Sequence, residues 1–497
     1  MNLMCVSRCG VVGVLVVAAM GAAAGAEVRY VRASLATGAD SGTGWGDAFR
    51  GRDGLSRALS VAVAGDEVWV AAGTYVPSIS GDRATSFVLR SGVAIYGGFA
   101  GSETARDQRD LGTNVTVLSG DLSGNDAPAP STTGTEENSY HVVHAGIANT
   151  SGILDGFTIS AGNANGLLAE DKDRGGGIIA ISAAPTIVNC RIVNNRCSFG
   201  GGGIYMRMAS PTITGCTIEA NNGGSFGGAC DMFSSCSPVW TRCSIIGNRA
   251  VRAGGVEVFG NCQPQFINCV FVGNTSTSTN IGQSGGGGLY IASNSMVTLR
   301  NCTIVGNTTT AAGGGVRASA SDVQIYNSIV YANTGPNAAT TGQQLVGATF
   351  TVRSSDVQGG YAGTGNIDLA PIYENAGLGD YRPGAGSPGI DAGNNAYVLA
   401  SMTTDRSGKT RLVNDPNITD TGAGTAPIVD LGCFERQLPP PPACAADFNG
   451  VGGVTVQDIF DFLDAFFRND LRANINGVGG VTVQDIFDYV GAYFTGC

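Results

Sequence analysis

The sequence predicts an all-β chain, a right-handed parallel β-helix solenoid, followed by a small α-helical domain. The first observation is a repeat: five cysteines recur at nearly regular intervals, and an asparagine follows each of them by five positions. Self-similarity at a fixed period is typical of a solenoid. The two columns are Cys190, Cys216, Cys243, Cys269 and Cys302, and Asn195, Asn221, Asn248, Asn274 and Asn307.

The second observation is that three short apolar patterns return in the same order in each repeat. The first follows a glycine run and has two apolar residues one apart, such as Ile204 and Met206. The second offers one apolar residue, such as Ile213, and the third joins a repeating cysteine to an apolar residue two positions on, such as Ile218. Alternate residues of a strand share a face, so each pattern predicts a strand. We expect three strands per turn, with regular rungs over about residues 175–333.

Stacking of the rungs gives each repeating residue type a role. A single turn cannot satisfy its own backbone hydrogen bonds, so each rung pairs with the next at roughly 4.8 Å. Like side chains then stack on like. We expect the five cysteines to be small interior residues and the asparagines to bond from rung to rung at a turn. Cys236 and Cys262 lie one repeat apart and could bridge neighbouring loops.

The N-terminal segment, residues 1–26, indicates export. It contains Arg8, an apolar run from Val11 to Ala19 and a small-residue cleavage site at Ala24 to Ala26, as a secretory signal does. No later apolar stretch is long enough to span a membrane. The formal net charge of −11 argues against nucleic acid or an anionic membrane as a partner. We therefore expect a secreted protein, extracellular or at the cell surface.

Two less regular segments flank the repeats and are expected to extend the β-helix over residues 27–437. In residues 27–165, segments such as "GDEVWVAAGTY" and "LDGFTISAGN" contain apolar strands that are ended by Gly or Asn. They resemble the N-terminal rungs of secreted β-helix surface proteins of the pectate-lyase-like and polymorphic outer-membrane types. Residues 334–437 contain "GSPGIDAGNN" and "VDLGCFE". This segment is similar to the terminal region of bacterial surface β-helix proteins that carry alternative C-terminal anchors.

A proline-rich linker at residues 438–443 separates the coil from a last module, residues 444–497. The module holds two similar copies in tandem, "FNGVGGVTVQDIFDFLDAFF" and "INGVGGVTVQDIFDYVGAYF", each a loop followed by an amphipathic helix. It resembles a dockerin of the type that is bounded by Cys and ends in Gly-Cys, here Cys444 and Cys497. A disulfide between them is expected, because so small a module has little core. The resemblance implies a protein docking partner.

Dockerin loops bind calcium much as EF-hands do, and these loops match that pattern in part. Position 5 is Val451 or Val478 where an acidic ligand is expected, and position 1 of the second loop is neutral. The first loop is therefore expected to bind calcium better than the second. The alternative is a metal-free helical hairpin held by its disulfide and apolar face. The candidate ligands are Asp447, Asn449, Thr455 and Asp458 in the first loop, and Asn474, Asn476, Thr482 and Asp485 in the second.

The rest of the chain holds few residues that are typical of catalysis. The two histidines, His141 and His144, are three apart on an expected strand, so they face opposite sides and cannot share a metal. Lysine occurs only at positions 172 and 409, which removes one base that polysaccharide lyases often use. Phosphate-binding loops, nucleophile elbows and zinc-binding helices are missing from the sequence.

The register of the repeats predicts one cluster of outward-facing side chains. The residues between the first inward pairs point outward and place Asp231 and Glu257 on adjacent rungs. Two positions on, the neighbouring outward column contains Phe233 and Phe259. Aromatic faces beside paired acids predict a sugar-binding groove. The residues expected to contact substrate are Tyr205, Arg207, Phe233, Phe259, Tyr290 and Arg317.

The two acids could also be catalytic. One rung is close to the roughly 5 Å carboxylate separation of retaining glycosidases, in which one acid attacks and the other donates a proton. Crowding of like charges would raise one pKa and supply the acid form. Polygalacturonase-like enzymes place acids on successive rungs of such a helix, but their surrounding motifs are absent here. The alternative is that Asp231 and Glu257 are solvated face residues or a minor calcium site.

Two hypotheses from different classes follow. The first is a surface or adhesive protein that interacts with a polysaccharide or cell-surface glycan and is docked through its C-terminal module. The second is a polysaccharide hydrolase or lyase with a dockerin-like appendage. The resemblance to dockerins, which accompany enzymes, favours the second, whereas the missing motifs and scarce His and Lys favour the first. Fold alone does not decide, since β-helices host both.

Overall fold

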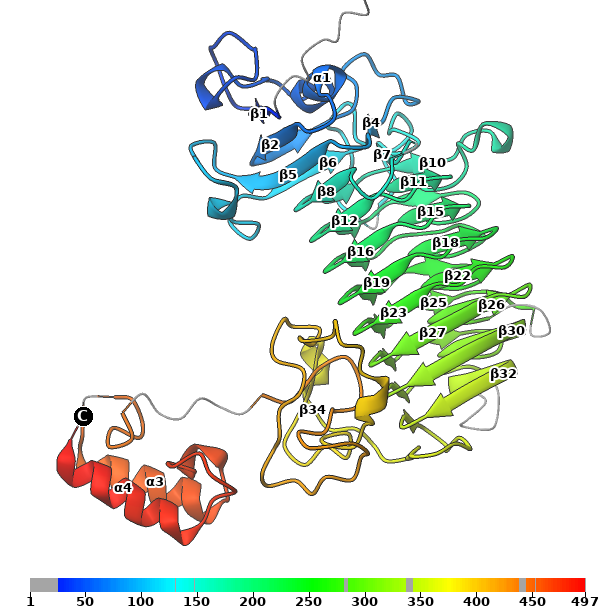
Figure 1. Ribbon diagram of the computed structural model, residues 1–497. Helices are drawn as coiled ribbons and strands as arrows, with labels where there is room; N and C mark the ends of the chain where they lie inside the picture. Colours follow the sequence, from blue (N-terminus) through cyan, green and yellow to red (C-terminus); the bar gives the residue numbers. More distant parts are fainter. Residues whose placement is uncertain are drawn as a thin grey trace, which may run out of the picture.

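The computed structural model describes residues 26–129, 131–146, 148–280, 285–336, 343–437, 444–451 and 453–496. Residues 1–25 of the predicted signal, the linker and Cys497 lie outside them. The chain winds into a parallel β-helix whose rungs run in sequence order from the N-terminal end to β32 (Figure 1). Within the described residues no helix has the length and apolar character that crossing a bilayer requires.

Two strand columns form one continuous sheet because the long strands β30 (Val316–Tyr326) and β32 (Leu345–Arg353) run through both. The first column contains β4 (Phe87–Val88), β7 (Val143–His144), β11 (Ile178–Ile181), β15 (Ile204–Arg207), β18 (Cys230–Phe233), β22 (Val256–Phe259) and β26 (Leu289–Ala292). The second contains β1 (Val28–Val31), β2 (Glu67–Ala71), β5 (Ala94–Phe99), β8 (Ile153–Asp155), β12 (Thr186–Val188), β16 (Thr212–Thr214), β19 (Val239–Thr241), β23 (Gln265–Ile267) and β27 (Met296–Arg300).

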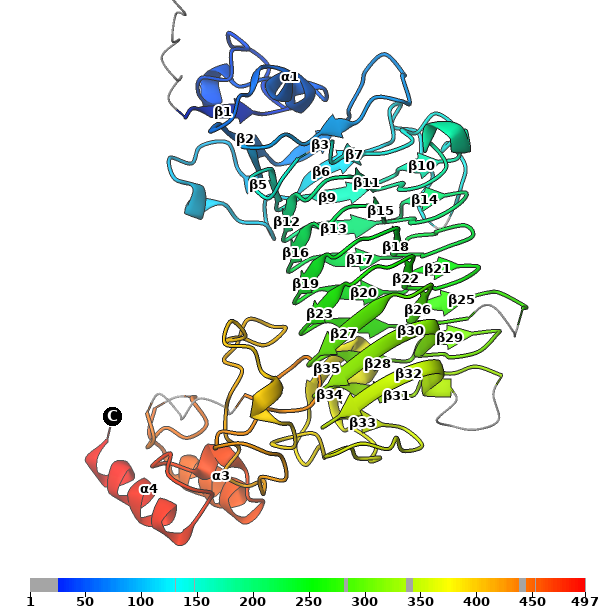
Figure 2. The ribbon, with the colours of Figure 1, turned by 45° about the vertical axis from the view of Figure 1, so that its right-hand side comes forward.

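A separate sheet of ten strands forms the third column, seen along the coil in Figure 2. Its strands are β3 (Gly73–Tyr75), β6 (Thr116–Ser119), β9 (Thr158–Ser160), β13 (Arg191–Val193), β17 (Thr217–Glu219), β20 (Ser244–Ile246), β24 (Val270–Val272), β28 (Thr303–Val305), β31 (Ile329–Tyr331) and β33 (Asp356–Val357). Short corner pairings follow it, formed by β10 (Asn163–Ala164) with β14 (Arg196–Cys197), and by β21 (Arg249–Ala250), β25 (Thr275–Ser276) and β29 (Thr308–Thr309). Three strands per turn are therefore confirmed.

The interior is built from columns of like residues. The five repeating cysteines are buried and free, as predicted. Trp240 and Phe266 stack on consecutive rungs with ring centroids 5.7 Å apart. Cys236 and Cys262 are also buried and free, and the backbone N–H of Cys236 donates to Cys262 Sγ at 3.2 Å, so the structure contains no bridge between them.

The asparagine column is a continuous hydrogen-bond ladder. Asn248 Nδ2 donates to the Ile218 carbonyl at 2.9 Å and to Asn274 Oδ1 at 3.0 Å. Asn248 Oδ1 accepts from the backbone N–H and the side-chain amide of Asn221, both at 3.0 Å. Each side chain thus binds the rung on either side of it, and Asn333 continues the ladder beyond the five predicted members.

The N-terminal end of the coil is covered by a helix that the sequence prediction missed. Helix α1 (Gly54–Val61) buries Leu55, Ala58 and Leu59 against the first rungs. These residues have the i, i+3, i+4 spacing of an apolar helix face. An exposed solenoid end would leave strand edges and core side chains in water, so a cap is physically required. Short 3₁₀ turns lie at Trp45–Asp47, Arg106–Gln108 and Leu168–Glu170.

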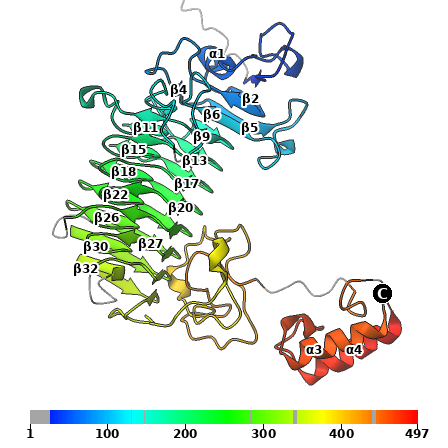
Figure 3. The same ribbon diagram turned by 180° about the vertical axis from the view of Figure 1, so that it is seen from behind.

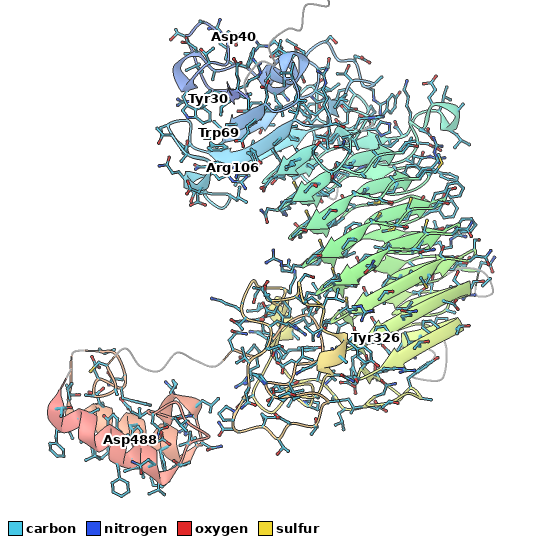
Figure 4. The ribbon with its side chains drawn as sticks, viewed as in Figure 1. Tyr30, Asp40, Trp69, Arg106, Tyr326 and Asp488 are labelled. Atoms are coloured by element: carbon cyan, nitrogen blue, oxygen red, sulfur yellow. The ribbon has the colours of Figure 1, made fainter. Side chains whose placement is uncertain are left out.

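Residues 371–437 correct the prediction that the coil runs to residue 437. Their turn-rich sequence lacks a strand period. They fold back along the side of the coil (Figure 3), with a small hairpin of β34 (Tyr373–Asn375) and β35 (Asp380–Pro383). Tyr326, labelled in Figure 4, stacks on Tyr397 at 4.5 Å. Short 3₁₀ turns occur at Ala376–Leu378 and Asn395–Tyr397.

The C-terminal module is a pair of helices, α3 (Val456–Phe467) and α4 (Val483–Thr495), with a 3₁₀ turn at Leu471–Ala473. Its core is aromatic: Phe462 and Tyr489 stack with ring centroids 4.0 Å apart, and the Phe448 ring lies edge-on to both. Cys444 is disulfide-bonded. Its predicted partner, Cys497, lies outside the described residues.

The ladder gives a stability prediction. Asn248→Ala should lower the free energy of unfolding by about 2 to 5 kcal/mol, because it leaves the Ile218 carbonyl and two donors of Asn221 buried without partners. Denaturant unfolding followed by circular dichroism measures this. Asn222→Ala removes an exposed amide next to the ladder and is the matched control. Equal stability of the two variants would show that the ladder is not a main support of the coil.

Candidate functional site

A pocket of about 290 Å³ opens on the first strand column, over β15, β18 and β22. Five of its residues come from these strands, and four come from the glycine-rich corners that precede β11, β15, β18 and β22. Acidic groups form its floor, and aromatic rings with two arginines form its walls. The lining residues are Arg174, Phe199, Tyr205, Phe226, Asp231, Phe233, Arg252, Glu257 and Phe259.

The register of the strands brings the two predicted acids together. Asp231 on β18 lies opposite Glu257 on β22, and Tyr205 and Tyr290 continue the column on either side. Both acids point out of the coil, yet they are only 4% and 2% exposed. The corner side chains cover them, so they are not solvated face residues.

Glu257 is held by an arginine. Arg252 Nε donates to Glu257 Oε2 at 3.1 Å, and Arg252 Nη2 donates to Oε1, so both carboxylate oxygens are engaged. The guanidinium also lies over the rings of Phe226 and Tyr290, at 4.4 and 4.7 Å from their centroids. Burial raises the pKa of Glu257, and the ion pair with Arg252 opposes that rise. A buried carboxylate so fully paired is a poor nucleophile.

Among the described residues, burial and neighbouring charges rather than a hydrogen bond dominate the environment of the Asp231 carboxyl group. Burial, reinforced by the neighbouring charge of Glu257, raises the pKa of Asp231 well above its usual value, although Arg174 and Arg252 oppose the shift. The raised pKa of Asp231 favours its protonated form, whereas the ion pair with Arg252 favours the carboxylate form of Glu257. A protonated acid that faces a pocket can donate a hydrogen bond to a ligand oxygen.

Arg174 closes the other side of the pocket. Its Nη1 donates to the Tyr205 hydroxyl at 2.9 Å, and its Nε donates to Asp173 Oδ1 at 3.0 Å. The guanidinium lies over the rings of Phe199 and Tyr205. Burial raises the pKa of Tyr205, so this phenol stays protonated. Arg174 is fixed by these contacts and lines the pocket.

The rim is formed by stacked rings. Phe233 and Phe259 are neighbours across two rungs, with centroids 5.9 Å apart and planes within 7° of parallel. Phe233 is 42% exposed. The two parallel, stacked rings form an apolar surface, the platform, beside the polar floor.

The predicted residues are brought together only in part. Tyr205, Phe233 and Phe259 line the pocket with both acids, and Tyr290 lies under Arg252. Arg207 is on the same strand as Tyr205 but forms a two-bond pair with Asp171, at 3.1 and 2.9 Å, and does not line the pocket. Arg317 lies opposite Tyr290 in the register, on β30, two rungs beyond the last strand of the pocket.

Sequence reasoning missed four lining residues, although the repeat contains the signal. Arg174, Phe226 and Arg252 lie in one column with Gly200, equally spaced along the sequence and four positions before each first strand. Phe199 precedes Gly200. The prediction considered only strand residues, whereas the corner column carries the arginines that set the charge of the pocket.

The loops of the C-terminal module satisfy much of their own hydrogen bonding. Asp458, at position 12 of the first loop, accepts from the backbone N–H of Asn449 and from both the N–H and the hydroxyl of Thr455. Asp485 accepts from Asn476 and Thr482 in the same way. These bonds cap helices α3 and α4.

One oxygen in each loop is left over. Asp447 Oδ1 and Asn474 Oδ1, at position 1 of the two loops, are buried without a hydrogen-bond partner among the described residues. Calcium takes six to eight oxygen ligands. Val451 and Val478 are exposed at position 5 and offer no side-chain oxygen. The residues therefore fit a calcium ion in part, through position 1, with the carboxylates of Asp458 and Asp485 already engaged.

The two histidines have structural surroundings. His141 is buried with Nδ1 3.0 Å from the Gly175 carbonyl, and burial lowers its pKa to about 4. His144 Nδ1 accepts from the backbone N–H of Gly146 at 2.8 Å.

Comparison with known proteins bears on the fold of the coil. Residues 144–330 match a family model described as a right handed beta helix region, which confirms the predicted right-handed parallel β-helix over that part of the chain. A crystal structure of pectate lyase Pel9A aligns with 13% sequence identity and a TM-score of 0.40, covering 83% of this chain and 97% of that one. No curated protein matches the chain significantly.

The raised pKa of Asp231 gives a prediction for stability against pH. A carboxyl group whose pKa is higher in the folded than in the unfolded chain makes folding less favourable as pH rises above about 4. Asp231→Asn removes this group, so unfolding free energy should fall less steeply between pH 5 and 8 than in the wild type, by up to about 1.4 kcal/mol per pH unit. Denaturant titrations at several pH values measure it.

The exposed Asp322→Asn is the control for removal of one charge. A slope for Asp231→Asn equal to that of the wild type would show that Asp231 does not titrate as a buried, unpaired acid.

Proposed function

We propose that the protein is secreted or surface-attached and binds a carbohydrate in the pocket over β15, β18 and β22. The observation that carries this proposal is the platform of Phe233 and Phe259 beside a floor of Asp231 and Glu257. A sugar ring has an apolar face of C–H groups and an edge of hydroxyls. It can lie on the platform and exchange hydrogen bonds with the acids and arginines at the edge.

The size and charge of the pocket restrict the class of ligand that it can bind. A volume of about 290 Å³ is at the lower end for small-ligand pockets, which suits one or two sugar rings at a chain end or side branch. Arg252 is paired with Glu257 and Arg174 with Asp173, and the raised pKa of Asp231 favours its neutral form. A neutral sugar therefore suits the pocket better than a highly charged one.

Binding without cleavage is the better supported of the two functional hypotheses. Retaining hydrolysis needs a free carboxylate nucleophile, and both oxygens of Glu257 are held by Arg252. The observation that favours catalysis is the raised pKa of Asp231, which would keep it protonated as a general acid. Activity would require substrate to displace Arg252 from Glu257.

We further propose that the C-terminal module is dockerin-like and attaches the β-helix to a protein partner. Its two helices expose large apolar side chains at equivalent positions of the repeat. Phe460 and Phe487 are 61% and 65% exposed, and Phe467 and Phe494 are 79% and 82% exposed. Exposed apolar rings at matched positions are typical of a docking surface.

The platform of Phe233 and Phe259 gives a prediction for glycan binding. Phe259→Ala should weaken binding of a recognised glycan about tenfold, because one stacking ring contributes roughly 1.4 kcal/mol. Affinity chromatography on immobilised polysaccharides, followed by titration of the retained glycan, measures this. Phe494→Ala removes an exposed ring outside the coil and should bind like the wild type.

Chain shortening is followed in the same samples. Retention without cleavage supports a binding protein, whereas cleavage that is lost in Asp231→Asn and Glu257→Gln would establish the enzyme instead. Binding unaffected by Phe259→Ala would move the site elsewhere.

The loops of the C-terminal module give a prediction for calcium binding. We propose weak binding, stronger in the first loop, where position 1 is the charged Asp447 rather than Asn474. Calorimetric titration of the oxidised module, residues 444–497, should show saturable calcium binding that Asp447→Ala reduces more than Asn474→Ala does. The absence of saturable binding at millimolar calcium would support the metal-free hairpin.

A further inference from the structure

A second group of oxygens converges away from the pocket, in the loop between β6 and β7, the strands labelled in Figure 2. Asp121, Asp126 and Glu137 each contribute a carboxylate oxygen, and these atoms lie within 4.8 Å of one another. Like charges so close repel unless a proton or a cation separates them. Exposed acids alone would be no sign of a site, so the buried atoms around them are decisive.

The cluster contains buried acceptors that lack donors. Asp126 Oδ1, Glu137 Oε1 and Asn138 Oδ1 are all buried, and none has a hydrogen-bond partner among the described residues. Asn138 is only 1% exposed, and its Nδ2 donates to Asp126 Oδ2 at 2.8 Å, so its amide head lies against the carboxylates. Buried polar atoms are rarely left unpaired, and each costs about 1–3 kcal/mol. These three oxygen atoms are hydrogen-bond acceptors in one cluster, and none of them binds a positively charged group among the described residues.

Both ends of the loop are fixed to the coil. Arg52 donates to the carbonyls of Asp121 and Leu122, at 2.8 and 3.2 Å. Arg83 Nε donates to the Asn138 carbonyl at 2.7 Å. The Asp121 carboxylate accepts from the backbone N–H groups of residues 124–126, which shapes the turn. The two ends of the loop and the Asp121 carboxylate are thus held in place by arginine and backbone contacts that a bound ion does not need to supply.

We propose that Asp121, Asp126, Glu137 and Asn138 form a calcium site. The donors are three carboxylates and an amide, all oxygen, with no His or Cys in the cluster. Calcium prefers such oxygen ligands, tolerates irregular geometry and completes its shell with backbone carbonyls and water. Zinc would favour nitrogen and sulfur, and magnesium a stricter octahedron.

The electrostatics of the loop agree with this proposal. Burial, Asp121 and Glu137 together raise the pKa of Asp126. A divalent cation would remove this repulsion and favour the ionised carboxylates, so ion binding and deprotonation are coupled.

The ion would also position a wall of a second, polar pocket. Thr132 of this loop lines a pocket of about 460 Å³ together with Arg196 and Arg249. Arg196 Nη2 donates to the Ser131 carbonyl at 3.1 Å, which ties the loop to β14. Calcium would therefore fix the loop against the corner of the coil that contains β14.

Peptide-resolved hydrogen exchange of the full chain tests the proposal, in EDTA and in millimolar CaCl₂. Peptides within residues 120–140 should exchange about tenfold or more slowly with calcium, because a ligand that binds only the closed loop stabilises it. The readout is local, so calcium bound by the C-terminal module does not affect it. The readout is also independent of whether the pocket over β15, β18 and β22 binds a carbohydrate.

Two substitutions and a control complete the test. Glu137→Gln and Asp126→Asn should each abolish the calcium-dependent protection of these peptides. The exposed neighbour Glu136→Gln should keep it. Equal exchange of the wild-type peptides in EDTA and in calcium would overturn the proposal, as would full protection retained in both Glu137→Gln and Asp126→Asn.

Discussion

The pairing of each rung with the next is the constraint on which the rest of this structure depends. Parallel strands about 4.8 Å apart place equivalent residues of successive repeats in contact. One choice of residue is therefore repeated along a column, as in the free cysteines and the asparagine ladder. Any irregular residue in a column is placed with the same precision, because its neighbours fix its position.

The pocket is such an irregularity. Two acids occupy consecutive positions of an outward column, and the corner column beside it supplies an arginine at each end. Arg252 neutralises Glu257, whereas Asp231 is a buried acid whose pKa burial and the charge of Glu257 raise. The proposed recognition of a neutral sugar therefore rests on a buried acid with a raised pKa, two arginines and a pair of stacked aromatic rings, whereas the pairing of Glu257 with Arg252 argues against nucleophilic attack.

The sequence was sufficient to predict the coil, because the period of the repeat determines which side chains are neighbours. It was also sufficient to predict that Asp231 lies opposite Glu257 and that Phe233 lies opposite Phe259. It did not predict the burial of the acids, since that depends on corner residues outside the strands. Helix α1 and the folding back of residues 371–437 also could not be predicted from the repeat. Both segments close or cover the coil, and neither shares its period.

The most direct test of the account is a crystal structure of the full chain with a glycan that it retains. The account predicts a sugar ring lying on Phe233 and Phe259, with hydroxyls within hydrogen-bond distance of Asp231 and of Arg174 or Arg252. A glycan bound elsewhere, for example between Arg196 and Arg249, with the pocket over β15, β18 and β22 free of sugar, would contradict it.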